Sequence, residues 1–133
     1  MTISLSQQIQ ALHPEITSDD FLTVITLQDD GSGPYIREWN HPTITQPTEA
    51  ELASVDEAAY LNKQALKVLR AERDRRLAET DWVTLKAIDA SIDGLGVQLP
   101  TLWMDYRQAL RDLPANTTDP ANPVWPVKPG GTP

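Results

Sequence analysis

The stretch that decides the fold is residues 48–79, TEAELASVDEAAYLNKQALKVLRAERDRRLAE, which contain no glycine or proline. They open with a capping box, because the Thr48 hydroxyl can accept from the Glu51 amide while the Glu51 carboxylate reaches back to the Thr48 amide. Apolar side chains then recur at a ragged helical spacing. We therefore expect one long helix or two abutting helices, since Ser54-x-x-Glu57 is a second capping sequence.

A helix of about 30 residues is roughly 45 Å long, at about 1.5 Å per residue. The whole chain has 133 residues, which is enough for one domain with appendages. A domain of that size cannot cover such a helix along its whole length. Part of the helix is therefore expected to project or to pack against another chain.

Residues 1–46 predict a module that combines a short helix with a β-hairpin. Apolar side chains favour a helix over residues 3–12. Residues 21–27, FLTVITL, are rich in β-branched and aromatic side chains and predict a strand. Residues 28–34 supply the turn, and residues 35–39 predict the returning strand.

Two further helices are predicted over residues 82–93 and 100–112, and Leu113-Pro114 closes the second one. Residues 115–133 are rich in proline and hold too few apolar side chains to fold alone, which predicts an extended tail. The fold class is therefore α+β, mainly α. Its three segments are the helix–hairpin module, a helical unit over residues 47–114, and the Pro-rich tail.

The helical unit is expected to bury the aromatic and leucine side chains that recur at helical spacing on otherwise polar helices. The predicted core residues are Trp82, Leu85, Trp103, Tyr106 and Leu110. Replacing a buried tryptophan by alanine costs about 3–5 kcal/mol, so we expect Trp103→Ala to unfold a domain this small.

Composition excludes several classes of function. The chain has no cysteine, which rules out disulfides, thiolate nucleophiles and Zn-thiolate sites. Its net charge of -8 argues against a nucleic-acid partner, because neutralising phosphates requires basic groups. No apolar run approaches the roughly 20 residues that span a bilayer, and residues 1–8 lack the regions of a signal peptide, so no membrane partner is expected.

A search for catalytic groups finds none at a recognisable spacing. His13 and His41 each precede a proline in an expected loop and have no orienting partner nearby in the sequence. The acidic pairs at 19–20 and 29–30 lack the alternating ligands of a calcium loop. We therefore predict no catalytic residue, no cofactor and no metal site, and a protein that is not an enzyme.

Charge is unevenly spread along the chain. Residues 1–57 hold ten acidic groups and one base, whereas residues 63–76 hold six bases and two acids. This split favours self-association or an acidic partner, and the alternative is a basic helix face that is simply solvated.

Partner contacts are predicted for the hairpin and for the Pro-rich tail. Residues 21–27 are too apolar for a strand with one solvent-facing side, and the helix over 3–12 can cover only one face of the hairpin. The second face or the strand edge therefore binds a partner, or the helix over 48–79 covers it. Trp125 lies between prolines and either folds back over the helices or anchors a partner. The predicted partner-binding residues are Phe21, Val24, Ile25, Trp39 and Trp125.

Three segments resemble motifs of phage tail assembly chaperone proteins. Residues 73–82, RDRRLAETDW, are similar to the family's R-D-x-x-L-x-x-T-D-W. Residues 103–114, WMDYRQALRDLP, are similar to its W-x-x-Y-R-Q-A-L-R-D-[IL]-P, and residues 123–126, PVWP, resemble its closing W-P. The motif and core residues are Arg73, Asp74, Asp81, Trp82, Trp103, Tyr106, Arg107 and Leu110.

The resemblance covers about residues 70–129. It implies a non-enzymatic protein of a tailed phage or prophage that binds the tail fibre and assists its assembly in the host cytoplasm. The alternative is a permanent virion component, such as an adaptor or cap on the fibre or baseplate. Fibres of this kind commonly have three-fold symmetry, so the implied partner is trimeric.

Within the resembling segment, Arg107 is expected to hold an acidic group of the helical unit, with Asp81 as the candidate. A bidentate pair with a carboxylate requires the planar fork of arginine, which lysine lacks. The alternative is an Arg107 side chain that lies in solvent.

Overall fold

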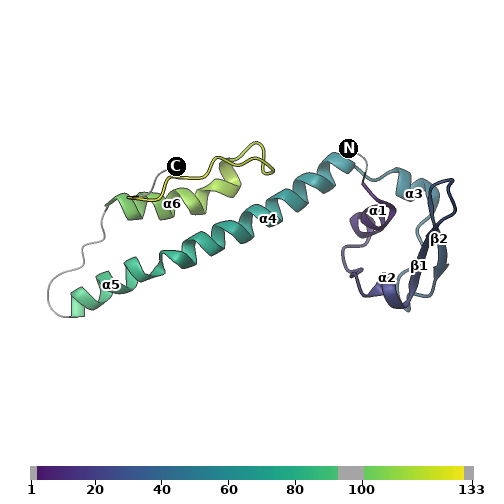
Figure 1. Cartoon of the computed structure of the whole chain (residues 1–133), viewed down its shortest axis with the longest axis horizontal. Coiled ribbons are helices and arrows are strands. Elements are labelled where there is room, and N and C mark those ends of the chain that lie inside the picture. The colour runs from purple at the N-terminus through teal and green to yellow at the C-terminus, as the bar shows by residue number, and fades with distance from the viewer. Residues whose placement is uncertain (1–2, 93–100, 131–133) are drawn as a thin grey trace. The chain divides into compact units, whose positions relative to one another are not determined.

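The computed structural model describes residues 3–92 and 101–130, and it confirms the predicted class, α+β and mainly α. The chain forms two compact units, Met1–Leu61 and Asn62–Pro133, which we call the N-terminal and C-terminal units. Figure 1 shows the hairpin and the short helices in the first unit and the longer helices in the second. The division into three segments, with its boundaries at 46/47 and 114/115, stays a prediction about which pieces act separately.

The N-terminal unit contains three short helices and two strands. These elements are α1 (Leu5–Leu12), α2 (Asp20–Thr23), β1 (Ile25–Asp29), β2 (Pro34–Trp39) and α3 (Glu49–Ala53). The predicted capping box makes both of its bonds: the Glu51 amide donates to Thr48 Oγ1 at 3.2 Å, and the Thr48 amide donates to Glu51 Oε2 at 2.8 Å. This reciprocal pair fixes the start of α3.

The strand predicted over residues 21–27 was wrong in its first half, because Asp20–Thr23 form α2 and β1 begins only at Ile25. A local hydrogen-bond pattern explains the difference. Oδ2 of Asp20 accepts from the Thr17 amide at 2.8 Å and from Thr17 Oγ1 at 3.0 Å, which starts a helical turn. These bonds hold a turn from Thr17 to Asp20, and the chain enters α2 there although the β-branched composition favours a strand.

The hairpin is antiparallel, with Ile25 opposite Trp39 and a bulge between Thr26 and Leu27. Its turn depends on two glycines with positive φ, Gly31 at 98° and Gly33 at 108°, a backbone region that other residues rarely adopt. Their amides donate to Oδ1 of the Asp29 carboxylate, so the acidic residue organises the turn.

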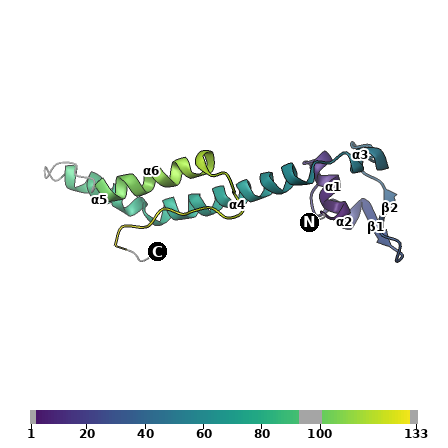
Figure 2. The ribbon, with the colours of Figure 1, turned by 90° about the horizontal axis from the view of Figure 1, so that it is seen from above.

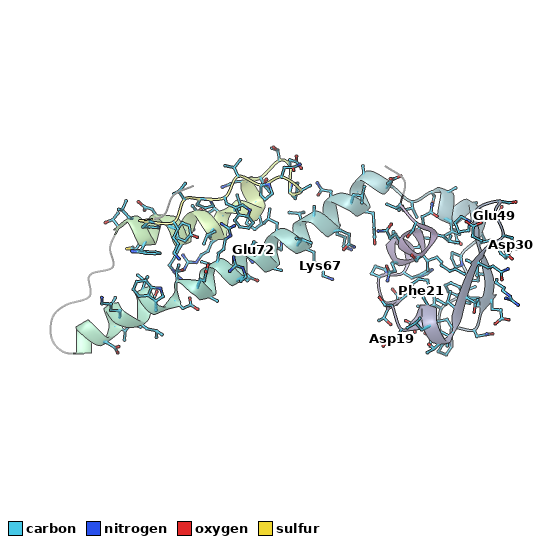
Figure 3. All side chains as sticks on the ribbon, in the orientation of Figure 1. Asp19, Phe21, Asp30, Glu49, Lys67 and Glu72 are labelled. Atoms are coloured by element: carbon cyan, nitrogen blue, oxygen red, sulfur yellow. The ribbon has the colours of Figure 1, made fainter. Side chains whose placement is uncertain are left out.

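One face of the hairpin covers the core of the N-terminal unit, and the other is polar. The buried core residues are Leu5, Ile9, Ile16 and Ile25, with Phe21, Val24, Leu27, Ile36, Trp39, Ile44 and Leu52 packed against them. Figure 3 shows Phe21 pointing to the inside of this unit, while Asp19 and Asp30 lie at its periphery. Thr26, Arg37 and Glu38 are exposed on the strands. The hairpin therefore has no second apolar face, which corrects the expectation that one exists.

Residues 48–79 form two helices rather than one, because α4 (Glu57–Glu79) is separate from α3. Oδ1 of Asp56 accepts from the Ala59 amide at 3.0 Å, so Asp56 provides the cap that the sequence placed at Ser54. The Ser54 hydroxyl instead donates to the carbonyl of Glu51 at 2.6 Å.

The C-terminal unit contains most of α4, followed by α5 (Asp81–Ile92) and α6 (Thr101–Asn116). Figure 2 shows α6 running alongside the end of α4 and α5. The predicted stop at Pro114 was wrong, since α6 continues through it to Asn116. A proline this close to the helix end removes one hydrogen bond only, and the Thr117 amide still donates to the Leu113 carbonyl at 3.0 Å. The start predicted at Pro100 lies outside the described residues.

The core of the C-terminal unit agrees only in part with the predicted set. Its buried residues, among those that the structure describes, are Leu69, Thr80, Val83, Ala87, Tyr106, Leu110 and Pro120. Trp103 is half-buried, whereas Trp82 is 51% exposed and Leu85 is 61% exposed, so these two were wrongly assigned to the core. The helix α5 carries apolar residues around its whole circumference, and its sequence therefore does not indicate which side faces inward.

Candidate functional site

Arg107 on α6 joins its helix to the junction between α4 and α5. Its Nη1 donates to the Leu77 carbonyl at 2.9 Å and to Thr80 Oγ1 at 2.7 Å, and its Nη2 donates to Asp81 Oδ1 at 2.9 Å. Only 13% of the Arg107 side chain is exposed, compared with 59% of Asp81. The expected pair of Arg107 with Asp81 is therefore present, but it is a single contact and not the expected bidentate one. The second guanidinium nitrogen binds the Leu77 carbonyl and the Thr80 hydroxyl, two acceptors that the sequence did not predict.

Thr80 completes this junction from the inside. The residue is fully buried, and its hydroxyl donates to the Leu77 carbonyl at 3.0 Å while accepting from Arg107. A buried polar group without hydrogen-bond partners destabilises the fold. Arg107 supplies the donor that the Thr80 hydroxyl oxygen accepts from, while the hydroxyl proton goes to the Leu77 carbonyl. Arg107 reaches the hydroxyl, the carbonyl and the carboxylate from two nitrogens. A lysine carries all its N–H donors on one nitrogen and could not reach the three acceptors together.

Arg76 on α4 makes the second link between motifs. Its guanidinium lies over the ring of Trp125, 4.1 Å from the ring centroid. Its Nε donates to Glu72 Oε1 at 2.8 Å, which fixes the guanidinium plane. Trp125 is half-buried. Of the two alternatives for this tryptophan, the structure shows the one in which the tail folds back onto the helices.

Glu72 is the common acceptor of two arginines. Arg75 Nη2 and Arg76 Nε each lie 2.8 Å from its Oε1. Hydrogen bonds from Arg75 and then Arg76 lower the pKa of the Glu72 carboxyl to about 2, and the same contact raises the pKa of Arg75. Arg73 forms a further pair with Asp74 at 2.7 Å.

The other three bases of the predicted basic stretch are left on the surface. Lys63, Lys67 and Arg70 are exposed and form no ion pair within residues 3–92 and 101–130. Figure 3 shows Lys67 extending from α4 into solvent. The basic stretch therefore divides into two sets. Its three arginines from Arg73 on pair with acidic groups of α4, and Arg76 also covers Trp125, whereas the three bases before them are exposed.

Aromatic rings form a cluster where α5 meets α6. Trp82 and Trp103 lie edge to face, with centroids 5.7 Å apart and planes at 72°, and Trp103 meets Tyr106 in the same manner at 6.2 Å. Tyr106 is buried and Trp82 is half-exposed, so the cluster leads from the core to the surface.

Exposed apolar side chains are concentrated in the C-terminal unit. The large hydrophobic residues found exposed there are Val68, Trp82, Leu85, Ile88, Leu102, Met104, Val124 and Val127, against Leu22 and Tyr35 in the N-terminal unit. The C-terminal unit has ten basic and nine acidic side chains, so its net charge is close to zero. Surface of this kind is typical of a protein that binds another protein.

Most of the residues predicted to bind a partner do not belong to this exposed apolar surface. Ile25 is 1% exposed, so it belongs to the core of the N-terminal unit and cannot present a surface. Phe21, Val24 and Trp39 are half-buried against the same core, and Trp39 Nε1 donates to the Ile44 carbonyl at 2.7 Å. Sequence reasoning missed the exposed apolar side of α5, although the all-round apolar character of that helix was a usable signal.

The histidines take structural positions. His41 Nδ1 accepts from the amides of Thr43 and Ile44, at 3.3 and 3.1 Å, and so closes a turn. His13 lies 3.7 Å from the Glu15 carboxylate. In the described part of the chain, no three His, Asp or Glu side chains gather closely enough to hold a metal ion, and no helix is both long and apolar enough to cross a membrane.

Comparison with known families divides the chain near the same point as the structure does. Residues 66–130 match the family described as phage tail assembly chaperone protein, and residues 5–64 match the family described as XkdW protein. The match over residues 66–130 confirms the similarity to phage tail assembly chaperone proteins that the resemblance over residues 70–129 predicted. The searches of curated proteins and of solved structures gave no match.

All three sequence motifs lie within the matched segment, and the two arginine contacts join them. Arg107 of the second motif binds Leu77, Thr80 and Asp81 of the first, and Arg76 of the first covers Trp125 of the third. The motif residues therefore build the C-terminal unit, while its surface remains free for a partner.

Proposed function

We propose that the protein is a non-enzymatic tail assembly chaperone that binds the phage tail fibre protein while the fibre assembles in the host cytoplasm. The observation that supports this proposal is the set of exposed apolar side chains on a unit with almost no net charge. An unassembled fibre exposes apolar subunit interfaces, and an apolar surface on the chaperone can cover them reversibly.

Attachment through α5 is favoured over attachment through the hairpin. Trp82, Leu85 and Ile88 follow one another at i, i+3 and i+6, which places them on one side of the helix, and they are 51%, 61% and 48% exposed. The hairpin offers polar strand faces instead. Its free edges could still add a strand of the partner, but they present no comparable apolar surface.

The test is co-expression of the chain with its fibre protein, followed by capture of the complex and measurement of assembled fibre. Leu85→Asp places a charge in the apolar side of α5 and should reduce fibre capture at least tenfold. Thr26→Asp, which places the same charge at an exposed position of the hairpin, is the control and should leave capture within about twofold. Both variants must keep the helical circular dichroism of the wild type. If a folded Leu85→Asp chain still captures the fibre fully, the attachment surface does not lie on α5.

A permanent place in the virion is the second candidate. The row formed by Lys63, Lys67 and Arg70 favours it, because these exposed bases are available to a second, acidic virion protein. Quantitative mass spectrometry of purified particles separates the two functions. A chaperone that leaves should be absent from the particles, whereas an adaptor should be present in a fixed ratio, which we expect to be three copies for each trimeric fibre.

A further inference from the structure

The C-terminal strip, residues 120–129, has a proline at every third position: Pro120, Pro123, Pro126 and Pro129. Pro120 lies in a turn closed by the Asn122 amide and the Asp119 carbonyl, and the extended part of the strip begins at Pro123. An extended polyproline helix has three residues per turn, so this spacing favours one row of prolines from Pro123 onward. Pro120 is buried and the other three are half-buried. In the next row, Val124 is 86% exposed and Val127 is 55% exposed. The prolines of the strip therefore face the protein, and Val124 and Val127 face solvent.

Side chains alone hold the strip in place. Trp125 is covered by the Arg76 guanidinium, which Glu72 orients. Within residues 3–92 and 101–130, no backbone–backbone hydrogen bond joins the strip to a helix. The one such bond that the strip makes, from the Asn122 amide to the Asp119 carbonyl, closes the turn at its start. Side-chain contacts therefore hold the strip, as they do in the recognition of Pro-rich segments, and β-strand pairing does not.

We propose that the surface around Arg76 is a binding site for Pro-rich segments that carry a tryptophan, and that the strip of a second copy occupies it in exchange for the chain's own. The strip is connected to α6 only through the short turn at residues 117–119, so reorienting that turn releases it without disturbing a helix. Two C-terminal units approach each other at little electrostatic cost, because each carries ten basic and nine acidic groups. Exchange of one identical element between copies is an established route to dimers.

In the wild-type chain the attached strip has a high effective concentration at its own site and excludes the strip of another copy. The exchange therefore becomes visible when the contact within one chain is broken. Arg76→Gln damages the site and keeps the strip intact, and Trp125→Ala keeps the site and removes the tryptophan. Each variant alone should sediment as a monomer. An equimolar mixture should form a one-to-one dimer, because the strip of the first variant fills the site of the second.

Arg111→Gln is the matched control for Arg76→Gln, because Arg111 is an exposed arginine on α6 without an ion pair in the described residues. Mixed with Trp125→Ala, it should give monomers only. A labelled peptide of residues 117–130 provides a measurement that does not depend on the Arg76 variant. It should bind the Trp125→Ala chain at least tenfold more tightly than the wild type. Monomers in the first mixture, together with equal peptide affinity for both chains, would overturn the proposal.

Discussion

At the scale of single residues, Arg107 is the side chain on which most of the helix junction depends, since it satisfies a carbonyl, a buried hydroxyl and a carboxylate. Hydrogen bonds to charged groups contribute about 1.5–3 kcal/mol each, but the exposure of Asp81 reduces the value of that pair. We expect Arg107→Ala to lower the free energy of unfolding by about 2–3 kcal/mol, measured by urea denaturation.

The control for this prediction is Arg111→Ala, one turn further along α6. Arg111 is exposed, and an exposed side chain without such contacts changes stability by less than about 0.5 kcal/mol. Arg107→Lys should fall between the two, because lysine retains the charge and loses the fork. Equal stability of the Ala variants at both positions would show that the junction does not depend on Arg107.

A pair of leucines on the same helix tests the core. Leu110 is 0% exposed and Leu102 is 71% exposed. Leu110→Ala should therefore cost about 2–5 kcal/mol of unfolding free energy, and Leu102→Ala less than about 0.5 kcal/mol. Trp103→Ala should cost less than the roughly 3–5 kcal/mol of a fully buried tryptophan, because this ring is only half-buried. A smaller effect at position 110 than at 102 would contradict the assigned core.

At the scale of secondary-structure elements, the acid stability of α4 depends on Glu72. A carboxyl whose pKa is lowered by folding stabilises the native state above its unfolded pKa, here the ordinary value of 4.5, and loses that contribution as the pH falls toward about 2. The melting temperature of Glu72→Gln should thus lie below that of the wild type near neutral pH, and the gap should close between about pH 4.5 and 2.

Asp105→Asn provides the comparison for that titration, since Asp105 is exposed on α6 and forms no ion pair in the described residues. Its melting temperature should follow the wild type at every pH. A gap for Glu72→Gln that stays constant into strong acid would mean that Arg75 and Arg76 do not act through the ionised carboxylate.

Elements with a local chemical signal could be predicted from the sequence, and those without one could not. The box at Thr48 gave the start of α3 correctly, because both bonds form within four residues. The turn of α2 carries a similar signal, Thr17-x-x-Asp20, which the β-branched residues after it obscured. Which side of α5 is buried depends on the packing of α6, and this is information that no local pattern in α5 contains.

The contacts of the candidate site could likewise be predicted only where the sequence itself suggests the partners. The pair of Arg107 with Asp81 could be predicted from the opposite charges, but its bidentate geometry was predicted wrongly. The roles of Leu77 and Thr80 could not, since they depend on how α4 ends. For Trp125 the sequence left two alternatives open, because a proline-flanked tryptophan suits a partner as well as its own chain.

At the scale of the whole molecule, the two compact units have separate hydrophobic cores. Ile9 in the first core and Leu110 in the second are each 0% exposed. We expect Ile9→Ala to lower the melting temperature of one calorimetric transition and Leu110→Ala that of another. The physical reason is that a cavity destabilises the core that surrounds it. A single transition that both variants shift equally would show that the units unfold together.

The uneven charge of the chain also governs its colloidal behaviour. The sequence has an isoelectric point of about 4.5, and this acidity comes from the N-terminal half, with ten acidic groups and one base in residues 1–57. A protease cut between the units would release a C-terminal fragment with ten basic and nine acidic groups and several exposed apolar side chains. We expect such a fragment to precipitate, because a net charge near zero promotes association. The acidic N-terminal unit therefore keeps the C-terminal unit in solution through its charge. Acidifying the intact chain toward its isoelectric point should reduce its solubility and make the solution turbid.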